Sequence, residues 1–166
     1  YKPTGRGKPA SEYLLRAAAD ESGFPRINWP VDVCNYISLS SLLPISIWDL
    51  DMTSGERFQF RLGKPDEKYT FNAAGQEISL EDLAVGCEGG GSALGSPIVN
   101  PIKDSMQTKT TDDTRRVMAC VYAPAEYPES ELENWCRTFQ SLLEQGAVAP
   151  VHSRIAVVQP GATGTC

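Results

Sequence analysis

Apolar and polar residues alternate along several stretches of the chain, and each alternation predicts a β-strand. The clearest is residues 57–62, Arg-Phe-Gln-Phe-Arg-Leu, in which every second residue is apolar. Residues 43–50 alternate as well, with Ile45 and Ile47 on one face and Ser46 and Trp48 on the other. The Ser54-Gly55 turn between these stretches favours a hairpin. Shorter strands are predicted at 68–71, 83–87, 117–122 and 155–158.

Three other segments carry apolar residues at helical intervals. The best is 130–145, where Ser130 and Glu133 predict a capping box and Gly146 predicts the end. A shorter helix is predicted at 11–22, with Ser11 as its N-cap. Residues 31–42 also fit a helix, although their β-branched side chains leave a strand open. Hairpins with flanking helices favour an α+β fold over alternating strands and helices.

The length and composition indicate one globular domain. The chain has 166 residues, of which 41% are hydrophobic and 22% charged, so the disordered and membrane classes are excluded. We expect a single domain with a basic arm at 1–9, containing Lys2, Arg6 and Lys8, and a flexible tail at 160–166. A net charge of −6 excludes a wholly basic nucleic-acid binder but permits a local basic patch.

Cysteine spacing argues against metal and disulfide chemistry. The five cysteines are odd in number and widely spaced, and no CxxC pair occurs. His152 is the only histidine, so neither a zinc site nor a Ser-His-Asp triad is expected. We predict no metal and no cofactor, and we interpret the chain as a reduced cytoplasmic protein with buried thiols.

A long segment from 88 to 113 is rich in Gly, Ser and Pro, and loops of that length are usually functional or disordered. Its glycine run could offer backbone N–H groups to a phosphate, a ribose or a carboxylate, or could be a flexible connector. Farther on, Lys103 and Lys109 stand among hydroxyl residues and Asp104. These residues could bind an anionic group, or they could form an ordinary solvated loop.

Two motifs in this chain occur in a specific order. Residues 28–36 read Asn-Trp-Pro-Val-Asp-Val-Cys-Asn-Tyr and residues 43–51 read Leu-Pro-Ile-Ser-Ile-Trp-Asp-Leu-Asp, followed by Phe60-Arg61. This pattern resembles the B3/B4 domain found in the β subunit of bacterial phenylalanyl-tRNA synthetases and in free-standing relatives. The resemblance runs from about residue 11 to 127, and 103–110 looks like the free-standing branch. It implies a three-layer α+β domain around an unusual β-sandwich with flanking helices, and an exposed Arg61.

In the synthetases the resembling domain hydrolyses tyrosine wrongly esterified to tRNA. Carried over, the family's Asn is Asn35, its His position holds Ser46, and its glycine turn corresponds to Gly89–Gly91. The family's glutamate, which reads the tyrosine hydroxyl, would fall near Ala119 or Cys120, where no acid occurs. The resemblance therefore implies a retained pocket without tyrosine specificity.

The resemblance implies a trans-acting, metal-independent hydrolase of mischarged aminoacyl-tRNA or a related amino-acid ester. The alternative is a non-catalytic module that binds tRNA or an amino acid. The partner would be the acceptor end of tRNA or an aminoacyl ester, not a membrane, and the oligomeric state stays open.

We expect Asn35 and Ser46 to be catalytic, positioning a water against the ester carbonyl in one pocket. Backbone N–H groups of the glycine turn would stabilise the oxyanion. The loop 103–109 would close over the pocket as a lid. The expected substrate-binding residues are Trp48, Gly89, Gly90, Gly91, Ser92, Lys103, Asp104, Ser105, Thr108 and Lys109.

Overall fold

Antiparallel strand pairs and helices build the protein, which confirms the α+β prediction. The computed structural model describes residues 7–20, 24, 26–55, 57–89, 95–159 and 161–162. Gly90, Gly91 and Ser92, with Lys2 and Arg6 of the arm, lie outside these ranges, as does most of the tail at 160–166. In the described part, no helix has the length and apolar character needed to cross a membrane.

The strands pair across long sequence separations. Strand β1 (Ile45–Asp49) pairs with β7 (Val117–Val121), and a second sheet has the order β2 (Phe58–Leu62), β5 (Ala84–Glu88), β6 (Pro97–Val99). A third pair joins β3 (Lys68–Thr70) to β4 (Glu77–Ser79).

The predicted hairpin between β1 and β2 is wrong. The short 3-10 helix η1 (Leu50–Met52) follows β1 directly, capped by Asp49, whose carboxylate accepts the Asp51 N–H at 2.8 Å. The Leu50 N–H donates to the Arg116 carbonyl, which keeps the chain beside β7. This turn leads the chain away from β1 before β2 begins.

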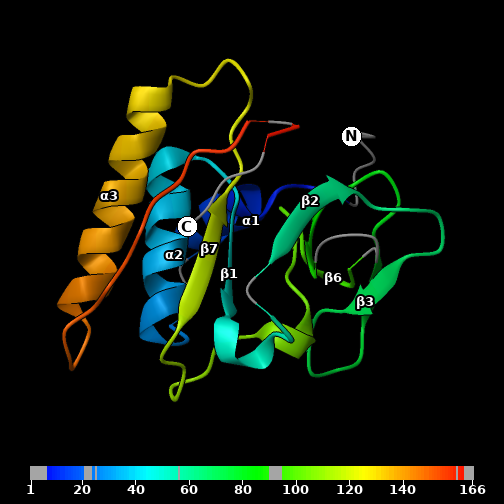
Figure 1. The fold of residues 1–166 in the computed structure, drawn as a ribbon, viewed down its shortest axis with the longest axis horizontal. Helices are drawn as coiled ribbons and strands as arrows, with labels where there is room; N and C mark the ends of the chain where they lie inside the picture. Colours follow the sequence, from blue (N-terminus) through cyan, green and yellow to red (C-terminus); the bar gives the residue numbers. More distant parts are fainter. Residues whose placement is uncertain are drawn as a thin grey trace.

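Helices cover one face of β1. Helix α2 (Trp29–Ser41) lies against β1, and both α1 (Ala10–Ala18) and α3 (Glu129–Gln145) pack on α2. Figure 1 shows α3, α2, the β1–β7 pair and the remaining strands in that order across the molecule. Val33, Ile37, Ile45, Ile47 and Phe139 form the apolar core between α2, α3 and β1.

The other face of β1 meets the second sheet. Trp48 packs with Ile98 and Val99 of β6, so alternate residues of β1 enter two different apolar clusters. Ser46 and Trp48 share this face, as the alternation in the sequence predicts. Strand β1 is therefore buried on both sides.

The first motif has a local physical explanation. Asn28 caps α2, with its side-chain oxygen accepting the Val31 N–H at 3.1 Å, and Pro30 occupies the first turn. Asp32 accepts the Ile27 N–H at 2.9 Å, which holds the preceding chain against the helix. Leu42, with φ of 60°, ends it. The capping resolves the choice between helix and strand in favour of a helix.

Several predicted boundaries are corrected. Helix α1 begins after Pro9, and Ser11 lies buried inside it rather than capping it. Helix α3 begins after Pro128 without a side-chain cap, so Ser130 and Glu133 form no capping box. Residues 155–158 are not a strand, and the three-residue strands β4 and β6 are too short for their alternation to be visible.

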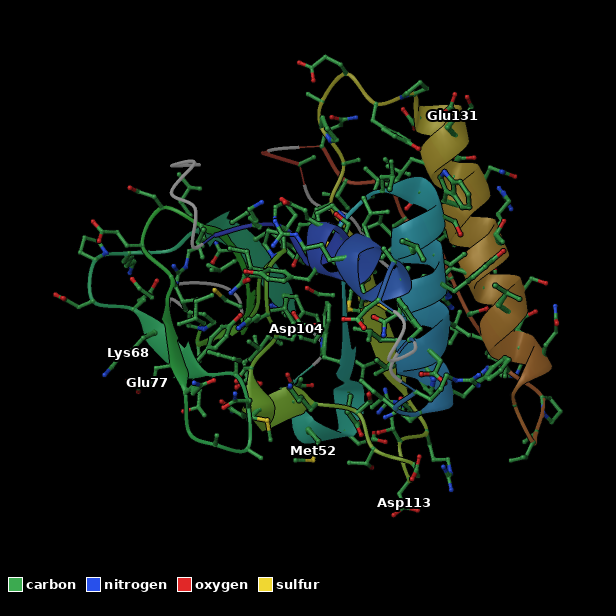
Figure 2. All side chains as sticks on the ribbon, turned by 180° about the vertical axis from the view of Figure 1, so that it is seen from behind. Met52, Lys68, Glu77, Asp104, Asp113 and Glu131 are labelled. Carbon is green, nitrogen blue, oxygen red and sulfur yellow. The ribbon has the colours of Figure 1, made fainter. Side chains whose placement is uncertain are left out.

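Charged side chains are distributed unevenly between the surface and the interior. Viewed from behind, Lys68, Glu77, Asp113 and Glu131 lie toward the edges of the molecule, whereas Asp104 lies near the centre of the view and is only partly exposed (Figure 2). The loop that carries Asp104 runs between β6 and β7 and contains the 3-10 helix η2 (Met106–Thr108).

Candidate functional site

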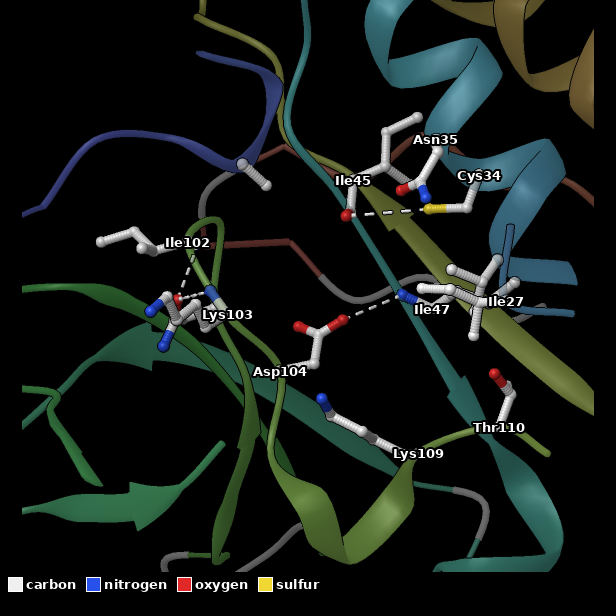
Figure 3. Close-up of a pocket in the computed structure, with 13 residues that line it drawn as sticks. Ile27, Cys34, Asn35, Ile45, Ile47, Ile102, Lys103, Asp104, Lys109 and Thr110 are labelled. Atoms are coloured by element: carbon white, nitrogen blue, oxygen red, sulfur yellow. Dashed lines mark hydrogen bonds between the residues drawn. The ribbon is translucent and has the colours of Figure 1, made fainter. Parts of the chain in front are cut away.

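A pocket of about 210 Å³ lies between the beginnings of α1 and α2, strand β1 and the loop 100–110 (Figure 3). Drug-sized ligands need roughly 300–1,000 Å³, so this space suits a smaller group such as an amino acid. Its apolar lining comes from Ala10, Ile27, Val31, Ile45, Ile47 and Ile102. Among the polar residues, Asn35, Asp104 and Lys109 also contribute to the lining.

The loop that forms one wall is anchored by Asn100, which is 2% exposed. The Asn100 side-chain oxygen accepts the N–H groups of Ile102 and Lys103, at 2.7 and 2.9 Å. The Asn100 amide donates to the hydroxyl of Tyr69, which in turn donates to the Lys103 carbonyl. These hydrogen bonds hold the first part of the loop as one wall of the pocket, and its closure as a lid stays a prediction.

The second part of the loop is tied to both sheet and helix. The Ser105 N–H donates to the Ile98 carbonyl, and the Ser105 hydroxyl caps η2 by accepting the Gln107 N–H at 3.1 Å. Asn28, the cap of α2, donates from its amide to the Thr110 carbonyl. Thr108 is 1% exposed, and its hydroxyl has no partner in the described chain. Ser105 and Thr108 thus lie in the loop's interior.

Asp104 is the acidic group of the pocket, and one of its two carboxylate oxygens has no hydrogen-bond partner among the described residues. One oxygen accepts the Ile47 N–H at 3.3 Å. The other has less than 1 Å² of exposed surface and no hydrogen-bond partner among the described residues. Burial raises the pKa of Asp104 to about 7. The Ser46 hydroxyl, the N–H groups of Ile47 and Asn100, and the charge of Lys109 oppose this with smaller effects. Near neutral pH this carboxyl group is ready to exchange a proton or accept a hydrogen bond.

The two lysines of the loop point in different directions. The Lys109 ammonium extends toward Asp104 (Figure 3), and its charge stabilises the ionised carboxylate. The Lys103 ammonium instead lies over the ring of Phe71, 3.8 Å from its centroid, in a cation–π contact. The sequence paired these lysines as one anion-binding unit, but only Lys109 faces the carboxylate.

Asn35 and Ser46 do not share a pocket wall as expected. Asn35 on α2 lines the pocket, and its side chain makes no hydrogen bond within the described chain. Ser46 is fully buried on the face of β1 that carries Trp48. Its hydroxyl lies 3.1 Å from both the Asn100 carbonyl and the Tyr122 hydroxyl. Ser46 therefore supports the loop wall from behind.

Trp48 and Gly89 lie away from this pocket. Trp48 is 1% exposed and meets the ring of Phe58 edge-on at 5.3 Å, inside the core rather than near a pocket wall. Gly89, with φ of 87°, donates its N–H to the Arg57 carbonyl at 2.8 Å. That N–H is therefore occupied and is not free to stabilise an oxyanion.

Sequence reasoning missed most of the pocket lining. Ile45, Ile47 and Ile102 are apolar residues in or near strands, and such residues are indistinguishable from ordinary core positions before the fold is known. Asn100 carried a weak signal, because an Asn before Pro101 in a turn commonly bonds to the backbone two residues on.

Comparison with protein families matches the B3/4 domain to residues 4–127, well over half of the chain. The matched range contains both sequence motifs, all seven described strands and every residue of the pocket lining. A search of curated proteins finds no match.

Proposed function

Because the chain belongs to the B3/4 domain family, we propose that it is a free-standing editing domain that hydrolyses mischarged aminoacyl-tRNA or a related amino-acid ester. The observation that carries this proposal is the pocket. It has the volume of an amino acid, isoleucine walls, and two polar side chains with unused hydrogen-bonding capacity, Asn35 and Asp104. A tRNA-related domain with such a pocket fits an aminoacyl group.

In the proposed reaction a water oxygen attacks the ester carbonyl carbon. The bond from that carbon to the ribose oxygen breaks, and a proton from the water passes to the leaving ribose oxygen. Asn35 holds the attacking water through its free amide, which contributes by positioning. Ser46 takes no direct part and keeps the loop wall in place through Asn100.

Release of amino acid from a panel of mischarged tRNAs tests this function. We expect turnover with at least one aminoacyl group, unaffected by a metal chelator. Asn35→Ala should lower turnover about tenfold or more while changing substrate affinity much less. Asn134→Ala, an exposed residue of α3, is the matched control. Equal turnover in wild type and Asn35→Ala would overturn the mechanism.

A non-catalytic module that binds tRNA or an amino acid is the second candidate. It is favoured by Ser46, which stands at the position of the family's His. The Ser46 hydroxyl already forms hydrogen bonds with the Asn100 carbonyl and the Tyr122 hydroxyl. The second candidate is also favoured by Ala119 and Cys120, neither of which is acidic. Binding of mischarged tRNA without any release of amino acid would select this candidate over the hydrolase.

The layer arrangement of the domain, its partner and its location are also part of the proposal. We propose a single domain over 1–166 with the family's three-layer β-sandwich arrangement, acting on the acceptor end of tRNA in the cytoplasm. The antiparallel sheets on either side of Trp48 support the sandwich. Superposition on an experimental structure of a family member would test the layer order.

A further inference from the structure

We infer that Asp104 binds the α-ammonium group of the ligand, so that the pocket selects amino-acid derivatives with a free amino group and an aliphatic side chain. The inference rests on the proposed function only in taking an aminoacyl group as the ligand. It adds which end of that group is read, by which residue, and which class of side chain fits.

The unpartnered oxygen of Asp104 carries the inference. A shielded carboxylate oxygen normally has a hydrogen-bond donor, since leaving it without one is unfavourable. Here the oxygen has no donor within hydrogen-bonding geometry in the described chain, and the second oxygen accepts the Ile47 N–H. The Ser46 hydroxyl and the Asn100 N–H lie close enough to favour the ionised carboxylate. A ligand ammonium group supplies three hydrogen-bond donors, whereas Lys109 contributes a nearby charge but no hydrogen bond to Asp104 within the described chain. The ligand ammonium group is therefore the partner that this arrangement lacks.

The pocket walls define the side chain of the ligand. Figure 3 shows Asp104 between Ile102 on one side and Ile47 on the other. Both isoleucines are at most 6% exposed, and Ile45 continues the same apolar surface. A polar side chain would lose its hydrogen bonds to water on this surface, and the small volume disfavours an aromatic one. An aliphatic side chain satisfies both conditions.

Lys109 completes the recognition. Its side chain is exposed and its ammonium points toward Asp104 (Figure 3). When the ligand ammonium binds the Asp104 carboxylate, the Lys109 ammonium rotates toward the ligand and donates a hydrogen bond to its carbonyl oxygen. The two charges of the pocket then bind opposite ends of one aminoacyl group.

Binding of two small probes tests the inference without tRNA or hydrolysis. L-leucinamide has a free ammonium group and a carbonyl but no ester, and N-acetyl-L-leucinamide lacks the ammonium group. By calorimetric or NMR titration at pH 7.4, we expect leucinamide to bind about tenfold or more tightly than its acetylated form. Asp104→Asn should abolish that preference, while Asp113→Asn, the same change at an exposed site, should retain it.

The possible results separate this inference from the proposed function. Equal binding of both probes to the wild-type protein, or no binding of leucinamide, would overturn it even if mischarged tRNA is hydrolysed. An Asp104→Asn variant that keeps the preference for leucinamide but loses turnover would also overturn it, by assigning Asp104 to proton transfer. Leucinamide selectivity without hydrolysis would support the inference and refute the hydrolase.

Discussion

Glu67 and Asp104 are both partly shielded carboxylates in loops, but their partners differ. Glu67 receives two N–H groups of Arg61, at 2.6 and 2.7 Å, and the Lys64 N–H at 2.7 Å. The Arg61 guanidinium is the main reason that the pKa of Glu67 is lowered to about 2. Asp104 receives one backbone N–H, and burial raises its pKa to about 7.

The difference separates a structural carboxylate from one available to a ligand. Arg61 donates to both oxygens of Glu67 across the turn between β2 and β3, and the Arg61 side chain, expected to be exposed, is only 12% exposed. The Arg61 Nε is shielded and has no hydrogen-bond partner among the described residues. The loop that carries Asp104 is hydrogen-bonded to the Asn100 side chain. One of the two carboxylate oxygens of Asp104 nevertheless has no hydrogen-bond partner among the described residues. Unsatisfied polar groups on a rigid support are typical of binding sites.

Breaking the Arg61–Glu67 pair should have the largest effect on the stability of the fold. Glu67→Gln removes the charge opposite a shielded guanidinium, so we expect a loss of about 2–3 kcal/mol in the free energy of unfolding at pH 7. Glu77→Gln, which breaks the exposed pair with Lys68, should change the free energy of unfolding much less, because water screens exposed ion pairs. Urea unfolding of both variants measures the difference.

The contribution of Glu67 to the free energy of unfolding should depend on pH. Because the folded-state pKa of Glu67 lies below its ordinary value, its stabilisation is complete above about pH 4.5. It should be lost as the pH falls toward 2. A penalty for Glu67→Gln that stays constant down to pH 2.5 would refute the lowered pKa.

Neutralising Asp104 should increase the free energy of unfolding, whereas neutralising Glu67 decreases it. Its raised folded-state pKa means that ionisation destabilises the fold as pH rises from about 4 through 7. Asp104→Asn should therefore increase the free energy of unfolding at pH 8 by about 1–2 kcal/mol, with the gain shrinking toward pH 4. Asp113→Asn should show no such trend. A loss of stability at pH 8 would contradict an unsatisfied carboxylate.

Ligand binding should follow the same ionisation. We expect leucinamide affinity to be about tenfold weaker at pH 5.5 than at 7.4, because Asp104 must be ionised. Affinity should fall again above about pH 8, where the ligand amine deprotonates. Cys34, Tyr69 and Tyr122 also surround Asp104, but burial raises the pKa of each, so they stay neutral in this range. Flat affinity from pH 5.5 to 7.4 would exclude Asp104 as the ligand's partner.

The smallest expected effect concerns tRNA and the two lysines. If Lys103, which lies over Phe71, contacts a tRNA phosphate, Lys103→Ala should weaken tRNA binding. The slope of log affinity against log salt concentration should then become shallower by about one unit. Lys109→Ala should in addition weaken leucinamide binding, because the Lys109 ammonium faces Asp104 in the pocket. Unchanged tRNA affinity and slope in both variants would remove these lysines from the tRNA surface.

Parts of the candidate site could be predicted from the sequence. Asn35 was identified through the family motif, and Asp104 and Lys109 through the density of polar groups in the loop. Ser46 was placed on the correct face of its strand, with Trp48. The side chains that cover each face could not be predicted, because alternation reports which residues point the same way and not what packs against them. Ser46 is consequently part of the loop's support and Trp48 part of the core.

The sequence by itself determined the elements whose causes are local. The Asn28 cap with Pro30 specifies α2, the apolar stripe specifies α3, and strict alternation specifies β2, because each signal acts within a few residues. Only the tertiary structure decided that β1 pairs with β7, about seventy residues away, rather than with β2. It alone also decided that one oxygen of Asp104 is shielded without a hydrogen-bond partner in the described chain, while Glu67 meets Arg61. The pKa and availability of a carboxylate depend on its neighbours in space, and those neighbours come from α2, β1 and the loop 100–110 together.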